Sequence, residues 1–167
     1  MQPTARLILR SPEETAALAR WLAPRLRPGD VLLLDGPIGA GKTHFARALI
    51  QALLATPEDV PSPTFTLVQS YESADGNAIW HADLYRLTDP EEVIELGLDE
   101  AFETAICLVE WPDRLGALAP AGALRIGFAA GPDDDARELS FAGEGPWQDL
   151  IATLQLWPEP VSEAADA

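Results

Sequence analysis

A chain of 167 residues, 47% of them hydrophobic, has the size and composition of one soluble domain with a single core. Its 27 acidic residues against 11 basic ones give a formal charge of -16, which argues against unaided binding to RNA or DNA, because that affinity depends largely on cation–phosphate contacts. The lone cysteine excludes an internal disulfide, and the sequence contains neither a membrane span nor the apolar core of a signal peptide. We therefore expect a cytoplasmic protein without membrane association, monomeric on its own, whose acidic surface suits a basic partner.

Alternating strands and helices are predicted along the chain. Apolar and alternating runs predict strands at 5–10, 31–35, 64–72, 78–85, 105–111, 123–129 and 137–143. Helical periodicity and capping residues predict helices at 11–26, 43–55, 89–98 and 146–157. The runs at 31–35 and 105–111 are apolar almost throughout, which is the pattern of strands buried on both faces of a sheet. The third and fourth strands, and likewise the last two, are joined by turn sequences and predict antiparallel pairs.

This succession predicts an α/β fold for residues 1–157. We expect a P-loop NTPase-like three-layer domain with a central mixed, largely parallel sheet. Ligands of such folds bind at the carboxyl ends of the strands, so the residues that end strands are the candidates for chemistry. Residues 158–167 are acidic and are expected to form a disordered tail.

The only lysine of the chain lies directly behind three glycines, in the sequence GPIGAGKT. Residues 36–43 fit the Walker A pattern, in which glycines let the main chain curl with its N–H groups inward and the following helix adds its positive end. Lys42 would then reach the β- and γ-phosphates, and the Thr43 hydroxyl would bind Mg²⁺. The residues expected to cradle phosphate with their backbone are Gly36, Gly39, Ala40 and Gly41.

A nucleotide site also needs an acid for the metal ion, and two strands end in one. Glu110 ends AICLVE and Asp83 ends AIWHAD, so both are expected at the edge of the sheet that carries the phosphate loop. Either acid could hold Mg²⁺ directly or through water, while the other orients the attacking water.

Several neighbouring residues have a role that the sequence leaves open. Thr64 and Thr66 in SPTFT could sense a γ-phosphate with their hydroxyls, as GTPase switch loops do. Alternatively, they could be present only because threonine favours β-strands. His81 shares a strand face with Asp83 and is interpreted as a structural residue or as an orienter of that acid; two histidines are too few to favour zinc. Trp111 could be a core aromatic or a wall of the site.

Four blocks, GAGKT, SPTFTLV, HADLYRL and LVEWPDRL, resemble in their order and spacing the TsaE family, bacterial ATPases of tRNA threonylcarbamoyladenosine biosynthesis. The resemblance covers roughly residues 8–145 and rests chiefly on the second pair of blocks, because P-loops alone are common.

The resemblance implies ATP and Mg²⁺ as cofactors and assigns residues to them. The implied metal ligands are Thr43 and Glu110. The implied catalytic residues are Lys42, Thr64, Asp83 and Glu110. Beyond the phosphate loop itself, the implied nucleotide contacts come from Ser11, Glu13, His44, Asp83 and Arg137.

The chain departs from the family pattern at three places. It has Pro37-Ile38 where Asp-Leu is common, His44 where a second threonine is usual, and Ala136 in place of a glycine.

The resemblance also implies TsaB and TsaD as partners, which transfer threonylcarbamoyl to an adenosine beside the tRNA anticodon. ATP hydrolysis would reset that assembly, and tRNA would be contacted only indirectly.

Two other functions use the same loop. A small-molecule kinase closes a lid of several arginines over the phosphates, whereas the arginines after residue 86 are scattered, at 114, 125 and 137. A nucleotide-gated binding module would bind ATP or ADP with little hydrolysis. A GTPase is disfavoured, because guanine recognition usually needs an Asn-Lys-x-Asp stretch and the one lysine is already used.

Overall fold

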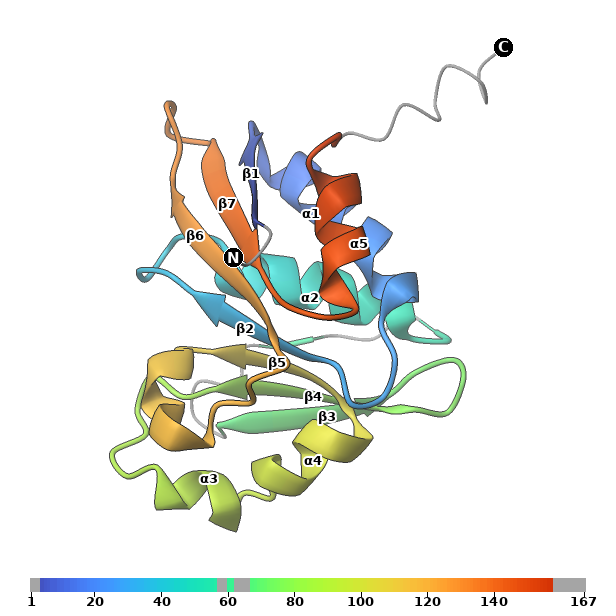
Figure 1. Ribbon diagram of the computed structural model, residues 1–167, viewed down its shortest axis with the longest axis vertical. Helices are drawn as coiled ribbons and strands as arrows, with labels where there is room; N and C mark the ends of the chain where they lie inside the picture. The colour runs from blue at the N-terminus through green and yellow to red at the C-terminus, as the bar shows by residue number, and fades with distance from the viewer. Residues whose placement is uncertain (1–3, 57–59, 62–66, 158–167) are drawn as a thin grey trace.

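The computed structural model describes residues 4–56, 60, 61 and 67–157. Within these residues, seven strands form a single mixed sheet in the order β1-β7-β6-β2-β5-β4-β3 (Figure 1). The strands are β1 Thr4–Leu9, β2 Val31–Asp35, β3 Val68–Glu72, β4 Ala78–Asp83, β5 Ile106–Glu110, β6 Leu124–Ala130 and β7 Arg137–Ala142. The central strands β6, β2, β5 and β4 are parallel, whereas β1, β7 and β3 run antiparallel to their neighbours. This is the mixed, largely parallel sheet predicted from the sequence.

The helices cover the sheet on two sides. They are α1 Pro12–Leu22, α2 Lys42–Leu53, α3 Glu91–Glu95, α4 Leu98–Thr104 and α5 Trp147–Leu154, with 3₁₀ turns η1 Ala23–Arg25 and η2 Pro112–Leu118. Figure 1 shows α1, α2 and α5 on one side of the sheet and α3 and α4 on the other. The α3–α4 layer covers β2, β5 and β4, whereas alternate residues of β1 remain exposed on that side.

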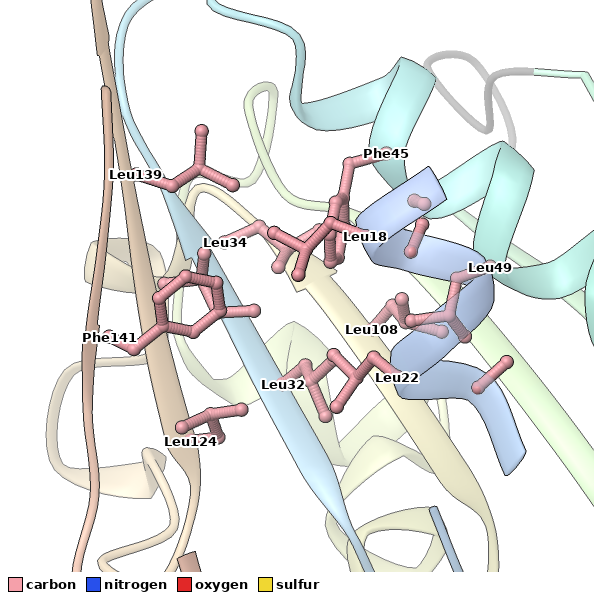
Figure 2. Close-up of a cluster of buried hydrophobic side chains, with 14 of the residues drawn as sticks. Leu18, Leu22, Leu32, Leu34, Phe45, Leu49, Leu108, Leu124, Leu139 and Phe141 are labelled. Atoms are coloured by element: carbon pink, nitrogen blue, oxygen red, sulfur yellow. The ribbon is translucent and has the colours of Figure 1, made fainter. Parts of the chain in front are cut away.

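Alternation along the apolar strands divides the core between these layers. Leu32 and Leu34 of β2 pack in the core under α1, α2 and α5 (Figure 2), whereas Val31 and Leu33 pack in the core under α3 and α4. Such a strand must be apolar on both faces, which explains its uninterrupted hydrophobic sequence. β5 alternates in the same way, and burial of its Cys107 raises the pKa of the thiol to about 12.

Helix starts follow the capping chemistry of the sequence. The Ser11 hydroxyl accepts the N–H of Glu14 at 3.2 Å, and the Glu14 carboxylate accepts the N–H of Arg10 at 2.8 Å. At α3, Asp89 and Glu92 make the corresponding contacts to main-chain N–H groups. The predicted helix 11–26 ends at Leu22 and continues as η1.

The helix predicted at 89–98 is wrong at its carboxyl end. It ends at Glu95, and Gly97 adopts a left-handed conformation with φ 82° that starts a separate, unpredicted helix, α4. η2 was not predicted either. The strand predicted at 64–72 is described only from residue 67 and begins at Val68. The tail predicted at 158–167 lies outside the described residues.

Among the described helices, none combines the length and the apolarity that crossing a bilayer requires.

We expect Gly97→Ala to lower the free energy of unfolding by about 1–2 kcal/mol, because an L-residue is strained in the left-handed region. Urea unfolding followed by circular dichroism measures this. Gly122→Ala is the matched control, since Gly122 has no left-handed φ and an added Cβ would meet no atom within 4 Å. Equal stability of the two variants would contradict the role given to Gly97.

Candidate functional site

The carboxyl ends of three parallel strands meet at one edge of the sheet. In the register of β5, Glu110 pairs with Asp83 of β4 on one side and with Leu34 of β2 on the other. The phosphate loop begins directly after β2. Both acids predicted from the sequence therefore lie at the edge that carries the loop, because the strands end level with one another.

The loop at residues 36–41 has a conformation that glycine makes possible. Gly36 has φ 146°, and a Cβ there would lie 2.5 Å from the carbonyl oxygen of Phe128 on β6. Gly39 and Gly41 adopt φ values of 81° and 101°. Gly41 is the N-cap of α2 and has no side chain to cap the helix, so the first N–H groups of α2 are available to an anion.

Lys42 lies inside the loop and is only 4% exposed. Its ammonium group donates to the carbonyl oxygen of Gly36 at 2.5 Å and lies 3.5 Å from the centre of the Trp111 ring. Burial lowers the pKa of Lys42, while the charges of the surrounding carboxylates, Glu110 first among them, oppose that shift. The sole ammonium side chain of the protein is thus held, partly desolvated, at the centre of the loop.

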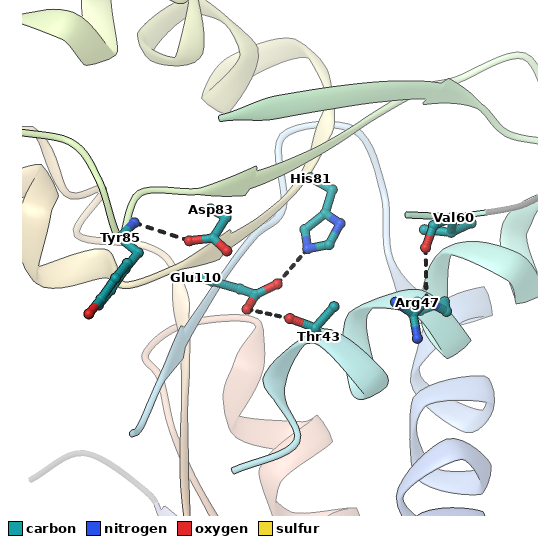
Figure 3. Close-up of polar contacts among 7 residues, drawn as sticks. All are labelled: Thr43, Arg47, Val60, His81, Asp83, Tyr85 and Glu110. Atoms are coloured by element: carbon teal, nitrogen blue, oxygen red, sulfur yellow. Dashed lines mark hydrogen bonds and ion pairs between the residues drawn. The ribbon is translucent and has the colours of Figure 1, made fainter. Parts of the chain in front are cut away.

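Glu110 is 2% exposed and is held from both sides. The Thr43 hydroxyl donates to its Oε1 at 2.8 Å, and Nε2 of His81 lies 2.7 Å from its Oε2 (Figure 3). The hydrogen bond that the structure gives His81 is therefore made to Glu110, and not to Asp83 as one interpretation of the sequence had it. The side-chain alternation of β4 and β5 explains this contact, because it turns His81 and Glu110 toward α2.

Asp83 is 6% exposed and ends β4. Its Oδ1 accepts the N–H of Tyr85 at 3.0 Å, which turns the chain at the strand end (Figure 3). The Tyr85 ring lies against that of Trp111, with centroids 4.9 Å apart. Trp111, with φ 60°, is half-buried: it packs against the core under α3 and α4 and also lines the site, so it has both of the roles that the sequence left open.

A cavity of about 450 Å³ unites most of the predicted residues. It is lined by Gly39, Gly41, Lys42, Thr43, His44, Asp83 and Glu110. Sequence reasoning did not include Tyr85 and Arg86, which also line it. Their position directly after Asp83 was the available signal, because a residue that follows a strand end lies at the same edge.

A smaller hollow of about 220 Å³ adjoins the cavity and shares Gly41 and His44 with it. Nε2 of His44 donates to the carbonyl oxygen of Pro12 at 2.9 Å, since a carbonyl can only accept. Arg137 donates to the carbonyl oxygen of Gly39 at 3.3 Å, so the late hairpin reaches the phosphate loop. Asp135, which was not predicted, also lines this hollow.

Two predicted residues, Ser11 and Glu13, stand apart from this arrangement. The Ser11 hydroxyl caps α1, Glu13 is exposed, and neither lines either of the two hollows in the described part of the chain. Thr64 lies outside the described residues, as does Thr66.

The donors at the edge suit a hard cation that keeps much of its water. In the described part of the chain, no group of three or more His, Cys, Asp or Glu side chains is placed to hold a metal ion. A hydroxyl and a carboxylate side by side, as in Thr43 and Glu110, are instead the sparse oxygen donors with which proteins bind Mg²⁺ together with phosphates.

The sheet and its glycine loop define the chain as a P-loop NTPase-like α/β protein. Residues 9–139 match the family described as "Threonylcarbamoyl adenosine biosynthesis protein TsaE". Two relatives, each named "tRNA threonylcarbamoyladenosine biosynthesis protein TsaE", are those of Rickettsia felis and Bacillus subtilis. The Rickettsia felis protein is 38% identical over 91% of this chain and 88% of its own length. The Bacillus subtilis protein is 42% identical over 84% of this chain and 87% of its own length. The crystal structure of Bacillus subtilis YdiB has a TM-score of 0.74 at 33% identity and covers 91% of this chain and 93% of its own. The chain belongs to the TsaE family.

We expect Thr43→Val to lower the free energy of unfolding by about 1–3 kcal/mol, because it leaves Oε1 of the buried Glu110 without its hydroxyl donor. Thr43→Ser keeps the hydroxyl and should stay within about 1 kcal/mol of the wild type. Chemical unfolding without nucleotide compares the three proteins. A loss in Thr43→Ser with none in Thr43→Val would show that the Thr43 methyl group, and not the hydrogen bond, is what matters.

Proposed function

We propose that this protein is a Mg²⁺-dependent ATPase that acts in the biosynthesis of tRNA N6-threonylcarbamoyladenosine. The observation that carries the proposal is the buried ammonium of Lys42 inside the glycine loop, beside a carboxylate and a hydroxyl that can hold a cation. Membership of the TsaE family supports the role in tRNA modification.

In this proposal, each residue of the site has a separate role in hydrolysis. The loop N–H groups and Lys42 would bind the phosphates, and Lys42 would exchange its contact with the Gly36 carbonyl for a phosphate oxygen. Thr43 and Glu110 would hold Mg²⁺, which when bound neutralises phosphate charge. Asp83 would position water for in-line attack, or a switch residue such as Thr64 that does so.

We assign the base and sugar of ATP to the smaller hollow beside the loop. It adjoins the phosphate cavity through Gly41 and His44, so a single nucleotide can extend from one into the other. The imidazole of His44 and the guanidinium of Arg137 are each held by main-chain carbonyl groups, and both are planar groups against which a purine can stack.

The partners that we propose are TsaB and TsaD, with hydrolysis coupled to their assembly. The net charge of -16 makes direct contact with the tRNA backbone unfavourable, so tRNA would bind to the partners. Two large apolar side chains, Ile38 and Tyr85, line the cavity yet are 72% and 43% exposed, which suits a surface that another protein covers.

Lys42→Ala should lower ATP hydrolysis at least about 100-fold, because the charge that stabilises the transferring phosphoryl group is lost. Release of inorganic phosphate from Mg·ATP, alone and with TsaB and TsaD, measures the effect. Arg125→Ala is the control, since it removes a cation from β6 outside both hollows described above and should keep wild-type turnover. Unchanged hydrolysis in the lysine variant would refute the proposal.

Asp83→Asn should lower partner-stimulated hydrolysis about 100-fold while Mg·ATP affinity stays within about threefold. The amide keeps an oxygen for the Tyr85 N–H but loses the charge that orients water. Calorimetry gives the affinity and phosphate release the rate. Asp89→Asn, at the exposed start of α3, is the matched control and should behave as wild type. Full stimulated activity in the Asp83 variant would remove that residue from the mechanism.

A further inference from the structure

A buried imidazole lies behind the candidate metal ligand. His81 is 0% exposed, and its Nε2 lies 2.7 Å from Oε2 of Glu110, itself 2% exposed (Figure 3). An ionised carboxylate only accepts hydrogen bonds, so Nε2 carries the proton and donates it. The other ring nitrogen, Nδ1, is buried and has no hydrogen-bond partner among the described residues.

Packing alone does not account for a histidine at this position. The residues nearest in register on the same side of the sheet, Ile79 before it and Leu108 opposite it, belong to the apolar core under α2. A leucine of similar volume would fill the space without leaving a buried polar nitrogen unpaired, which costs free energy. Within the described part of the chain, the one polar contact of His81 is to Glu110, and this contact is therefore the feature that the side chain contributes.

The two carboxylate oxygens of Glu110 therefore have different hydrogen-bond partners. Oε2 faces the His81 ring on β4, whereas Oε1 faces Thr43 at the start of α2 (Figure 3). Without the imidazole, only the Thr43 hydroxyl would hold the carboxylate, which could then rotate away from the phosphate loop. Groups that orient a ligand in this way typically change metal affinity by about 10–100-fold when they are removed.

We propose that His81 is a positioning residue that holds Oε2 of Glu110 and so presents Oε1 to a divalent cation beside the nucleotide phosphates. The inference rests on the proposed function in that it takes Glu110 as a Mg²⁺ ligand. It assigns no chemical step to the imidazole. His81 acts through Glu110 alone, and the affinity of the loop for phosphate without metal does not depend on it.

The test measures ADP binding by calorimetry in EDTA and in saturating Mg²⁺, and takes the ratio of the two affinities as the metal-dependent gain. His81→Leu should reduce this gain at least about tenfold and leave the affinity in EDTA within about threefold. His81→Gln places an amide N–H near the position of Nε2 and should restore most of the gain. His81→Asn, whose amide reaches only the position of Nδ1, should not restore it.

Ile79→Ala is the matched control, because it loosens the same strand and core without touching Glu110. It should lower stability yet keep the metal-dependent gain. In a Glu110→Gln background, His81→Leu should have no further effect on the gain, since the imidazole acts only through that carboxylate.

Two results would overturn the inference: a wild-type metal-dependent gain in folded His81→Leu, or equal gains in the Gln and Asn variants. The second comparison decides the question if His81→Leu does not fold. A wild-type protein that binds ADP in neither buffer would instead refute the proposed nucleotide function, so the two failures are distinguishable.

Discussion

The buried carboxylate of Glu110 connects the three elements from which the site is built. It ends β5, accepts a hydrogen bond from Thr43 at the start of α2, and accepts another from His81 on β4. A buried charge is tolerated only where hydrogen bonds and opposite charge compensate for its lost hydration. The position of α2 against the sheet, and with it the curl of the phosphate loop, is therefore coupled to the register of two neighbouring strands.

Lys42 provides the positive charge that compensates the carboxylate of Glu110. The protein holds it in a partly desolvated position, where a carbonyl oxygen, an aromatic face and several carboxylates together replace water. In the proposed function, Lys42 would exchange these contacts for phosphate oxygens. Trp111, the aromatic wall of the site, has its backbone in the left-handed region. Strained backbone conformations of this kind cluster at functional sites.

The two layers of helices have different relations to this edge. The layer that contains α2 carries the loop and faces His81 and Glu110, and its core is continuous from β1 to α5. The layer of α3, α4 and η2 packs against the opposite face of β2, β5 and β4, and η2 begins immediately after Trp111. The strand ends at the site are thus held from both faces, which limits how far Asp83 and Glu110 can move relative to the loop.

The sequence by itself determined the features that depend on local chemistry. The glycine spacing predicted the loop, and the uninterrupted apolar runs predicted strands buried on both faces. The acids that end AIWHAD and AICLVE predicted Asp83 and Glu110 at one edge of the sheet. The helix break at Gly97 could not be derived in this way, because the periodicity continues across it and only packing selects a left-handed glycine there. The tertiary structure alone decided that His81 binds Glu110, that Lys42 lies over Trp111, and that Arg137 reaches Gly39. These contacts join residues 29, 69 and 98 positions apart, and they follow from the order and register of strands, which no local pattern specifies.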